Sequence, residues 1–203
     1  MSPVPKVFSY KLVRDYGFAP NPFHGICTLG TCKPQIRKAA RVGDIVVGCG
    51  SVGLNLPEKL IFVMRVSQKL SFQEYWEDER FRIKRPDLYS SNSMAYGDNI
   101  YHVVNDSWVQ EDSHHSFDGG LINQANLVRD LGSDNVLIGE EFVYWGANAV
   151  EIPAHLRNFQ GEDLYPPARN YRCTFSDAFR VEVDTWFKSL PTRGFRSRPA
   201  SWR

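Results

Sequence analysis

Residues 18–51 read FAPNPFHGICTLGTCKPQIRKAARVGDIVVGCGS, and the rest of the chain is interpreted around this stretch. The APNP run near its start excludes regular helix, because each proline lacks an amide proton and restricts the residue before it. Residues 31–41 predict one short helix, with Pro34 in its first turn and Ile36 on a small apolar face. So many residues with special backbone geometry indicate one wall of a ligand pocket.

The second half of the stretch predicts a turn, a buried strand and a glycine-rich segment that follows the strand. Gly43-Asp44 forms the turn and residues 45–47 form the strand. The glycine-rich segment, GCGS at 48–51, lacks the residue spacing of a phosphate-binding loop. Its backbone can still approach a flat ligand closely. We interpret Asp44 as a turn former and Cys49 as a small buried residue.

The ligand-binding residues expected in this stretch can act in two ways. Turn amides can hold the edge of a base, while basic side chains neutralise a phosphate. The alternative is a rigid loop followed by a solvated helix face. The residues are Asn21, Phe23, Thr28, Lys33, Arg37, Gly48, Gly50 and Ser51.

Composition indicates one globular domain. The chain has 203 residues, of which 42% are hydrophobic and 13% aromatic, enough for a ring-rich core. The formal net charge of +1 does not mark a nucleic-acid binder. We expect a single α+β domain over 1–190 and a basic C-terminal tail over 191–203. From Lys188 onward every charged residue is basic: Lys188, Arg193, Arg196, Arg198 and Arg203.

Targeting signals and metal motifs are not recognisable. The start, MSPVPKVFSY, lacks the apolar core of a signal peptide, and no run approaches the roughly 18 apolar residues of a membrane span. We therefore expect a cytoplasmic protein with reduced cysteines. Cys27 and Cys32 do not form a C-x-x-C pair and no second ligand pair follows. We expect no metal and no cofactor.

The order of the remaining elements indicates the fold class. Strands and short helices do not alternate as βαβ units do, which favours an α+β fold. We expect a mixed or antiparallel curled sheet, or a small PUA-like β-barrel, with flanking short helices and a C-terminal helix after Ser176. Ser71 and Glu74 match a capping box, and Asn105-Asp106 can turn a hairpin. Strands are predicted at 6–13, 59–66, 98–104, 107–110, 135–138 and 142–145.

The candidates for catalysis are few and scattered. His114 and His115 would point to opposite sides of a strand, so they would not converge on one metal there. One of them can act as a general base or bind phosphate, and a structural role for the pair is the alternative. Asp98, Cys27 and Asp15 complete the set of acid, base and nucleophile candidates.

Strand aromatics offer stacking surfaces. Two rings at the mouth of a barrel can sandwich a flipped base, worth roughly 1–3 kcal/mol per base. In the strand at 142–145, Tyr144 and Trp145 lie on opposite faces, so one face is core and the other is available. The ligand-binding candidates outside residues 18–51 are Asn99, Tyr101, Tyr144 and Trp145.

The pattern APNPF–G-x-CTL–x-x-CKP-x-IR-x-x-A-x-x-GD-x-V-x-G-x-GS resembles the second nucleotide modification associated domain family. Further matches are Tyr75, Phe81, Lys84, Pro86, GDNIY at 97–101, His114-His115 and FVYWG at 142–146. The resemblance covers residues 6–153. It implies a bacterial or phage setting in which DNA bases are modified. A second resemblance, over about thirty residues, is to PUA-like barrels of the EVE and ASCH type, which implies a pocket for a modified base.

Three functions follow as hypotheses. The first is binding of a modified base or nucleotide, in DNA, within a nucleotide-modification or phage-defence system. The second is an enzyme that installs or edits a DNA base modification. The third is a protein–protein adaptor. The expected partner is a nucleic acid or nucleotide with a modified base, and no membrane.

Overall fold

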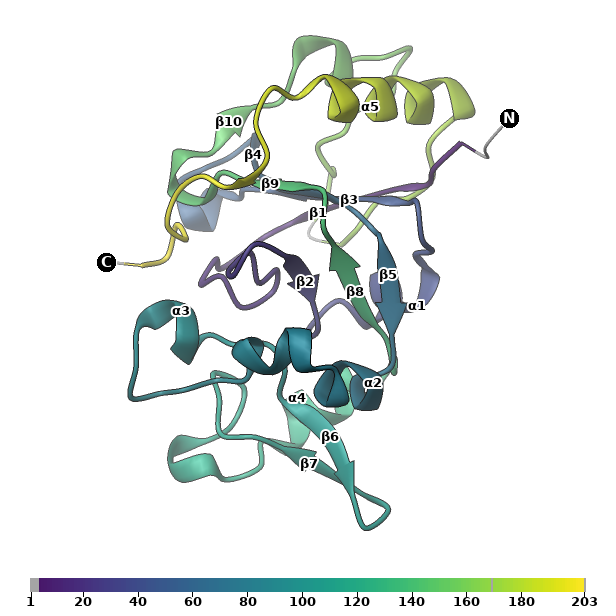
Figure 1. Ribbon diagram of the computed structural model, residues 1–203. Coiled ribbons are helices and arrows are strands. Elements are labelled where there is room, and N and C mark those ends of the chain that lie inside the picture. Colours follow the sequence, from purple (N-terminus) through teal and green to yellow (C-terminus); the bar gives the residue numbers. More distant parts are fainter. Residues whose placement is uncertain (1–3, 169, 203) are drawn as a thin grey trace. The chain divides into compact units, whose positions relative to one another are not determined.

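A computed structural model describes residues 4–168 and 170–202 (Figure 1). The chain forms two compact units, each with its own hydrophobic core. The terminal unit comprises Met1–Asp15, Ala40–Ser67 and Gly139–Arg203. The inserted unit comprises Tyr16–Ala39 and Gln68–Ile138.

The terminal unit contains a mixed sheet. Its strand order is β1-β3-β4-β9-β11, and β10 also pairs with β4. The β1–β3 and β9–β11 pairs are parallel, whereas β4 is antiparallel to β3, β9 and β10. The predicted α+β fold with a mixed sheet is therefore confirmed. The strands are β1 (Val7–Lys11), β3 (Ile45–Cys49), β4 (Lys59–Arg65), β9 (Phe142–Tyr144), β10 (Val150–Glu151) and β11 (Gly194–Phe195).

The sheet of the terminal unit is open. Its path begins with β1 and ends with β11, so the described strands do not show a PUA-like barrel. Strand β11 lies in the stretch expected as a tail, where Phe195 is in register with Tyr144 and their rings stack at 5.7 Å. Part of this basic stretch is thus sheet.

Helix α5 (Asp177–Ser189) covers one face of this sheet (Figure 1). Ser176 caps it by accepting a hydrogen bond from the Phe179 backbone N–H, as its sequence predicts. Phe179, Val183 and Phe187 are fully buried in the core of the unit. Burial of each such side chain contributes about 1.5–3 kcal/mol. The remaining short helices of the unit are η1 (Val52–Leu54), η4 (Gly146–Asn148) and η5 (Ala154–Leu156).

The longest helix among the described residues, α5, has 13 residues, and its exposed side chains include Asp177, Thr185 and Lys188. No helix in the described part of the chain is long and apolar enough to cross a bilayer.

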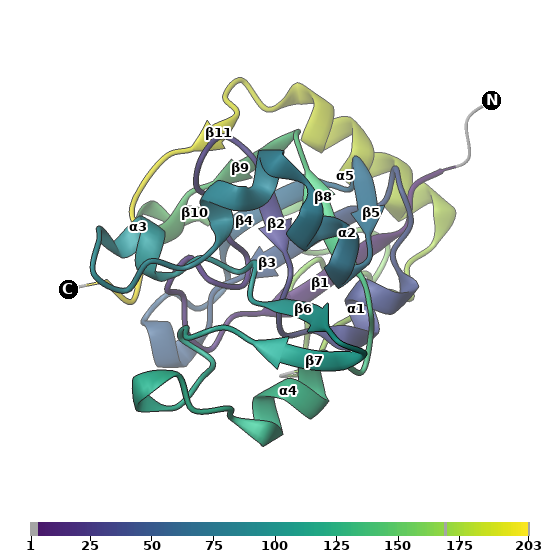
Figure 2. The same cartoon turned by 60° about the horizontal axis from the view of Figure 1, so that its bottom comes forward.

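The inserted unit is built from a small sheet and a hairpin. The sheet has the order β2-β8-β5, with β2 (Cys27–Leu29), β8 (Val136–Gly139) and β5 (Gln68–Leu70). Strands β6 (Tyr101–Val104) and β7 (Ser107–Gln110) form the hairpin (Figure 2). Its turn residues have positive φ, 48° at Asn105 and 60° at Asp106, as a type I′ turn requires. The predicted hairpin is confirmed.

Short helices complete the inserted unit. The capping box predicted at Ser71 and Glu74 is present at the start of α2. Residues 121–130, ambiguous in sequence, end in α4, which Asn123 caps. The core includes Phe72, Tyr75 and Ile138. The helices are α1 (Pro34–Ala39), α2 (Phe72–Glu77), η2 (Glu79–Lys84), α3 (Asn92–Ala95), η3 (Asp118–Gly120) and α4 (Gln124–Asp130).

Candidate functional site

A strained turn joins strand β2 to helix α1 in the inserted unit. Two consecutive residues of this turn, Cys32 and Lys33, have φ values of 55° and 43°. Such left-handed backbone costs about 1–3 kcal/mol at a non-glycine residue and persists only where surrounding contacts hold it. Helix α1 therefore begins at Pro34, three residues later than the sequence predicted. Cys32 is half-buried at this strand-to-helix junction.

Two buried charged residues hold the turn. The Cys32 backbone N–H donates to Asp130 Oδ1 at 2.9 Å. Arg37 donates from Nε to the Cys32 carbonyl oxygen at 2.7 Å, and from its other nitrogens to the carbonyl oxygens of Asp130, Ser133 and Asn135. Arg37 is fully buried, so its donors are used to join α1 to the end of α4. The phosphate contact considered for Arg37 from sequence stays a prediction.

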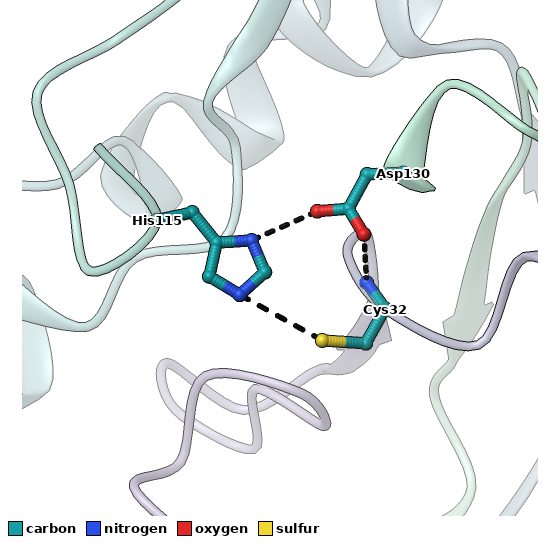
Figure 3. A group of neighbouring side chains, drawn as sticks. All are labelled: Cys32, His115 and Asp130. Atoms are coloured by element: carbon teal, nitrogen blue, oxygen red, sulfur yellow. Dashed lines mark hydrogen bonds and ion pairs between the residues drawn. The ribbon is translucent and has the colours of Figure 1, made fainter. Parts of the chain in front are cut away.

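The side chain of Cys32 belongs to a Cys–His–Asp group (Figure 3). Its Sγ atom lies 3.7 Å from Nε2 of His115. The other ring nitrogen of His115, Nδ1, lies 2.8 Å from Oδ2 of Asp130. The three residues come from the β2–α1 turn, the 111–123 loop and the end of α4. The three side chains therefore lie in a row in space: a nucleophile, a base, and a carboxylate that orients the base.

The His115–Asp130 pair is charged at neutral pH. Burial alone would lower the pKa of His115, but the hydrogen bonds with Asp130 and Cys32 raise this pKa to about 9. Burial would raise the pKa of Asp130, but the His115 hydrogen bond and the Arg129 charge lower it. Tyr101 also donates its hydroxyl to Asp130 Oδ2 at 2.9 Å. The imidazole is thus largely protonated at neutral pH and has a fixed orientation.

The donor set suits proton transfer better than metal binding. Asp130 already accepts hydrogen bonds at both carboxylate oxygens, from Cys32, Tyr101, Arg129 and His115. Each of the three residues offers one ligand atom, and these atoms lie within 4.8 Å of one another, but Asp130 would have to share oxygen atoms that already accept hydrogen bonds. The Arg129 guanidinium lies 3.5 Å from Nε2 and would repel a cation. Structural zinc sites need four protein ligands and catalytic ones usually three.

A ring group lies directly beside the Cys–His–Asp group. Tyr16 and Tyr96 stack with ring centroids 5.3 Å apart and an interplanar angle of 8°. The exposed His114 ring contacts both edge-on, at 4.9 and 5.2 Å. Phe18 contacts His114 at 5.3 Å and His115 at 4.5 Å. We call Tyr16, Phe18, Tyr96 and His114 the ring group.

A family model described as nucleotide modification associated domain 2 matches residues 4–203. The chain belongs to this family. Its name connects the chain with nucleotide modification. The match extends beyond the 6–153 resemblance seen in the sequence, because it includes α5 and strand β11. Comparison with curated proteins and with solved structures gave no match.

In this nucleotide modification associated domain, Asp98 organises the core under the strained turn. It is fully buried and accepts hydrogen bonds from Thr28 Oγ1 at 2.8 Å, Tyr75 OH at 2.8 Å and the Gly30 N–H at 3.0 Å. Cys27 is also fully buried, and burial raises the pKa of its thiol far above the usual value. These contacts give Thr28, Asp98 and Cys27 structural tasks, and their part in catalysis or binding stays a prediction.

The Pro-rich loop is anchored by Lys84, which is fully buried. Its Nζ donates to the carbonyl oxygens of Asn21, Phe23 and Ile26 and to Asn21 Oδ1, at 2.7 to 3.1 Å. The Asn21 side chain also donates to the Tyr96 carbonyl oxygen at 2.9 Å. The loop amides proposed to read a base edge thus belong to a rigid scaffold beside the ring group.

The other expected binding residues of the inserted unit lie in different settings. Asn99 is buried and donates to the carbonyl oxygens of Tyr75 and Phe81. Tyr101 donates its hydroxyl to Asp130, and Lys33 is half-buried in the strained turn. His115 is buried and His114 exposed, but neither lies on a strand. The prediction that their rings point to opposite sides was wrong, since the ring centroids lie 6.0 Å apart and both rings contact Phe18.

The expected residues of the terminal unit serve its core. Tyr144 is fully buried and donates its hydroxyl to Asp15 at 2.5 Å. A Cβ at Gly48 would lie 2.2 Å from the Phe62 ring, and one at Gly50 would lie 2.1 Å from the Leu56 carbonyl oxygen. The absence of a side chain at these glycines leaves room for Phe62 and Leu56 of the same chain. Ser51 and Trp145 are half-buried, and their role in binding stays a prediction.

The terminal unit also contains a cavity of about 440 Å³. Its charged lining is partly neutralised, since Arg65 and Lys188 pair with Asp184. It holds none of the catalytic or ligand-binding candidates selected from sequence. Its lining residues are Val4, Pro5, Lys6, Arg41, Val42, Gly43, Asp44, Arg65, Arg180, Asp184 and Lys188.

Sequence reasoning missed Cys32 and Asp130 as parts of a site, and Tyr16 and Tyr96 as parts of the ring group. A signal for Cys32 was present: CKP follows a strand and precedes a helix, the position of an exposed nucleophile on a sharp turn. Asp130 carried no such signal, because 98 residues separate it from Cys32 in the chain.

Proposed function

We propose that this domain binds a modified base or nucleotide, in DNA, and that the ring group supplies the stacking surface. The observation that carries the proposal is the convergence of four rings, from three separate segments, beside a Cys–His–Asp group. Tyr16, Tyr96 and His114 retain exposed surface, unlike the fully buried Tyr101 and Tyr144. The family name supports a nucleotide as the ligand.

The physical basis is stacking on a rigid platform. A base that stacks on an aromatic side chain gains about 1–3 kcal/mol. The Lys84-anchored loop holds the Asn21 side chain, which in turn contacts the backbone of Tyr96, so the ring group loses little entropy on binding. Extrusion of a base from duplex DNA costs a few kcal/mol, and a modified base can recover this cost through added contacts.

The test is a titration of the full chain with oligonucleotides that differ only in one base. The panel contains an unmodified pyrimidine, its 5-hydroxymethyl form and its 5-glucosyloxymethyl form, each as single strand, duplex and mononucleotide. We expect tighter binding of at least one modified form. Tyr96→Leu should weaken it by about 5- to 150-fold, the equivalent of one stacking contact. The matched control is Tyr89→Leu, because Tyr89 is fully exposed in the same unit.

Equal binding of all forms, or an equal loss in the Tyr96 and Tyr89 variants, would contradict the proposal. The first result would remove the preference for a modified base, and the second would remove the ring group as the surface.

A second candidate function is an enzyme that installs or edits a base modification. The specific observation in its favour is the order Cys32 Sγ, His115, Asp130, which matches the arrangement of a nucleophile with its base. Nucleoside mass spectrometry of DNA after incubation with the protein measures turnover. We expect Cys32→Ala to abolish it and Cys173→Ala, a half-buried cysteine of the terminal unit, to leave it unchanged.

A further inference from the structure

We propose that Cys32 is a covalent nucleophile for acyl transfer, and that its substrate is an acyl group carried on an amine of a nucleobase or nucleotide. The inference deepens the second candidate function and rests on it for the nucleotide part. The covalent part rests on the inserted unit alone.

The backbone around Cys32 is the first support. The residue stands between a strand and a helix with a left-handed φ of 55°, and Lys33 repeats this conformation. A sharp strand-to-helix turn presents a nucleophile clear of the sheet behind it. The turn is over-determined, since Asp130, Arg37 and Asp98 all bind its backbone. The strain is thus held at the one half-buried thiol of the unit, whereas Cys27 is fully buried.

The side-chain order is the second support. His115 Nε2 lies 3.7 Å from Sγ, and Nδ1 is fixed by Asp130 at 2.8 Å. The carboxylate holds the tautomer that leaves Nε2 directed at sulfur and stabilises the imidazolium that forms when the proton moves. These residues supply a nucleophile and one proton carrier. This arrangement supports substitution at an electrophilic carbon.

The residue before Cys32 in the chain carries a buried hydroxyl. Thr31 is fully buried, and its Oγ1 has no hydrogen-bond partner among the described residues. Leaving such a group unsatisfied costs about 1–3 kcal/mol.

The reaction balances with water as the only co-substrate. In molecules whose His115 is neutral, Nε2 accepts the Sγ proton, and sulfur attacks the carbonyl carbon while the C=O pair moves to oxygen. The C–N bond then breaks, and the amine leaves with the proton from Nε2. Water gives a proton to Nε2 and attacks the thioester, and the C–S bond breaks as sulfur regains its proton. The products are a carboxylic acid and the free amine.

The test uses the full chain and p-nitrophenyl acetate, an acyl donor without a base. After reaction, an acid quench and peptide mass spectrometry locate the acetyl group. We expect it on Cys32 as a thioester that neutral hydroxylamine removes. Cys32→Ser should lose this thioester, and Cys173→Ser should keep it. His115→Gln should acylate about 10²-fold more slowly, the typical contribution of a general base.

A measurement on the unaltered protein guards against misfolded variants. Iodoacetamide alkylation rates of Cys32 and Cys173 are compared within the same molecules. Faster alkylation of Cys32 than of Cys173 supports the proposal, whereas equal rates overturn it. The proposal is also overturned if the His115→Gln variant is folded, as judged by circular dichroism, and is acylated at the wild-type rate. Because neither reagent carries a nucleotide, acylation of Cys32 without turnover of DNA nucleosides would reject the second candidate function and retain the nucleophile.

Discussion

The imidazole of His115 lies 2.8 Å from the carboxylate of Asp130 in the interior of the inserted unit. Both side chains are largely buried, so the charge on the ring is stabilised by one close partner instead of by water. This contact makes the charge state of His115 a measurable property of the folded protein.

The contact predicts a pH dependence of stability. The pKa of His115 is raised to about 9 from an ordinary value of 6.5, so the folded state binds the proton more tightly than the unfolded state. The added stability is fully present below pH 6.5 and is lost as the pH rises through about 9. The loss is on the order of 3 kcal/mol. Cys32, Arg129 and His114 also face or adjoin the ring and modulate it.

Urea unfolding from pH 6 to pH 10 measures this effect as the difference in free energy between wild type and His115→Gln. His155→Gln is the control, because His155 is exposed in the terminal unit. A difference that does not shrink as the pH rises would contradict the assigned charge.

The anchor of the Pro-rich loop predicts a large loss of stability in Lys84→Met. The variant keeps much of the side-chain volume but removes four hydrogen bonds. The Asn21 carbonyl oxygen and Oδ1 keep the Thr28 and Phe23 N–H donors, whereas the carbonyl oxygens of Phe23 and Ile26 lose the donor described for them. Each buried acceptor without a partner costs about 1–3 kcal/mol, so the variant should lose several kcal/mol. Chemical denaturation measures the loss, and hydrogen exchange should increase first at 21–28.

Lys38→Met is the matched control, since Lys38 is exposed on α1. An equally small effect in both variants would show that the loop does not depend on Lys84.

We expect substitution by alanine to have opposite effects on stability at two glycines of the terminal unit. A Cβ at Gly48 would overlap the Phe62 ring, so Gly48→Ala should cost about 1–3 kcal/mol through overpacking. A Cβ at Gly53 would meet nothing closer than 3.8 Å, so Gly53→Ala should be neutral or slightly stabilising. Thermal unfolding compares the two. Reversal of their order would contradict the packing of β3 against β4.

The hairpin turn predicts a stabilising substitution. Asp106 has a φ of 60°, which glycine adopts without the steric cost that other residues bear. Asp106→Gly creates the Asn-Gly pair preferred in type I′ turns and should add roughly 0.5–1 kcal/mol. Asp106→Ala should destabilise by a similar amount. If both variants had the same melting temperature, the turn would have to be of another type.

The sequence predicted the elements whose signals are local. The capping box at Ser71, the Asn105-Asp106 hairpin and the helix after Ser176 depend on residues a few positions apart, and all are present. The mixed sheet followed from strand order. Helix α1 was predicted too long, because the strain at Cys32 and Lys33 comes from distant contacts that the sequence does not display.

The candidate site depends on the long-range contacts that local patterns do not encode. His115 was among the candidates chosen from the sequence, but Asp130 was not, since it lies in an ambiguous stretch and meets Cys32 only through folding. Tyr16 and Tyr96 likewise meet across 80 residues. The strand aromatics selected for stacking include Tyr144, whose full burial and bond to Asp15 explain its presence without a ligand.

The interleaving of the two units has a consequence for synthesis on the ribosome. The chain emerges from its N-terminus, so Cys32, His115 and Asp130 have all been made when the inserted unit ends at residue 138. At that moment the terminal unit still lacks β9, β10, α5 and β11. One apolar face of strands β1, β3 and β4 therefore stays exposed to solvent until α5 has been synthesised. A chain that ends before Asp177 would retain every residue of the Cys–His–Asp group yet expose the apolar surface that drives aggregation.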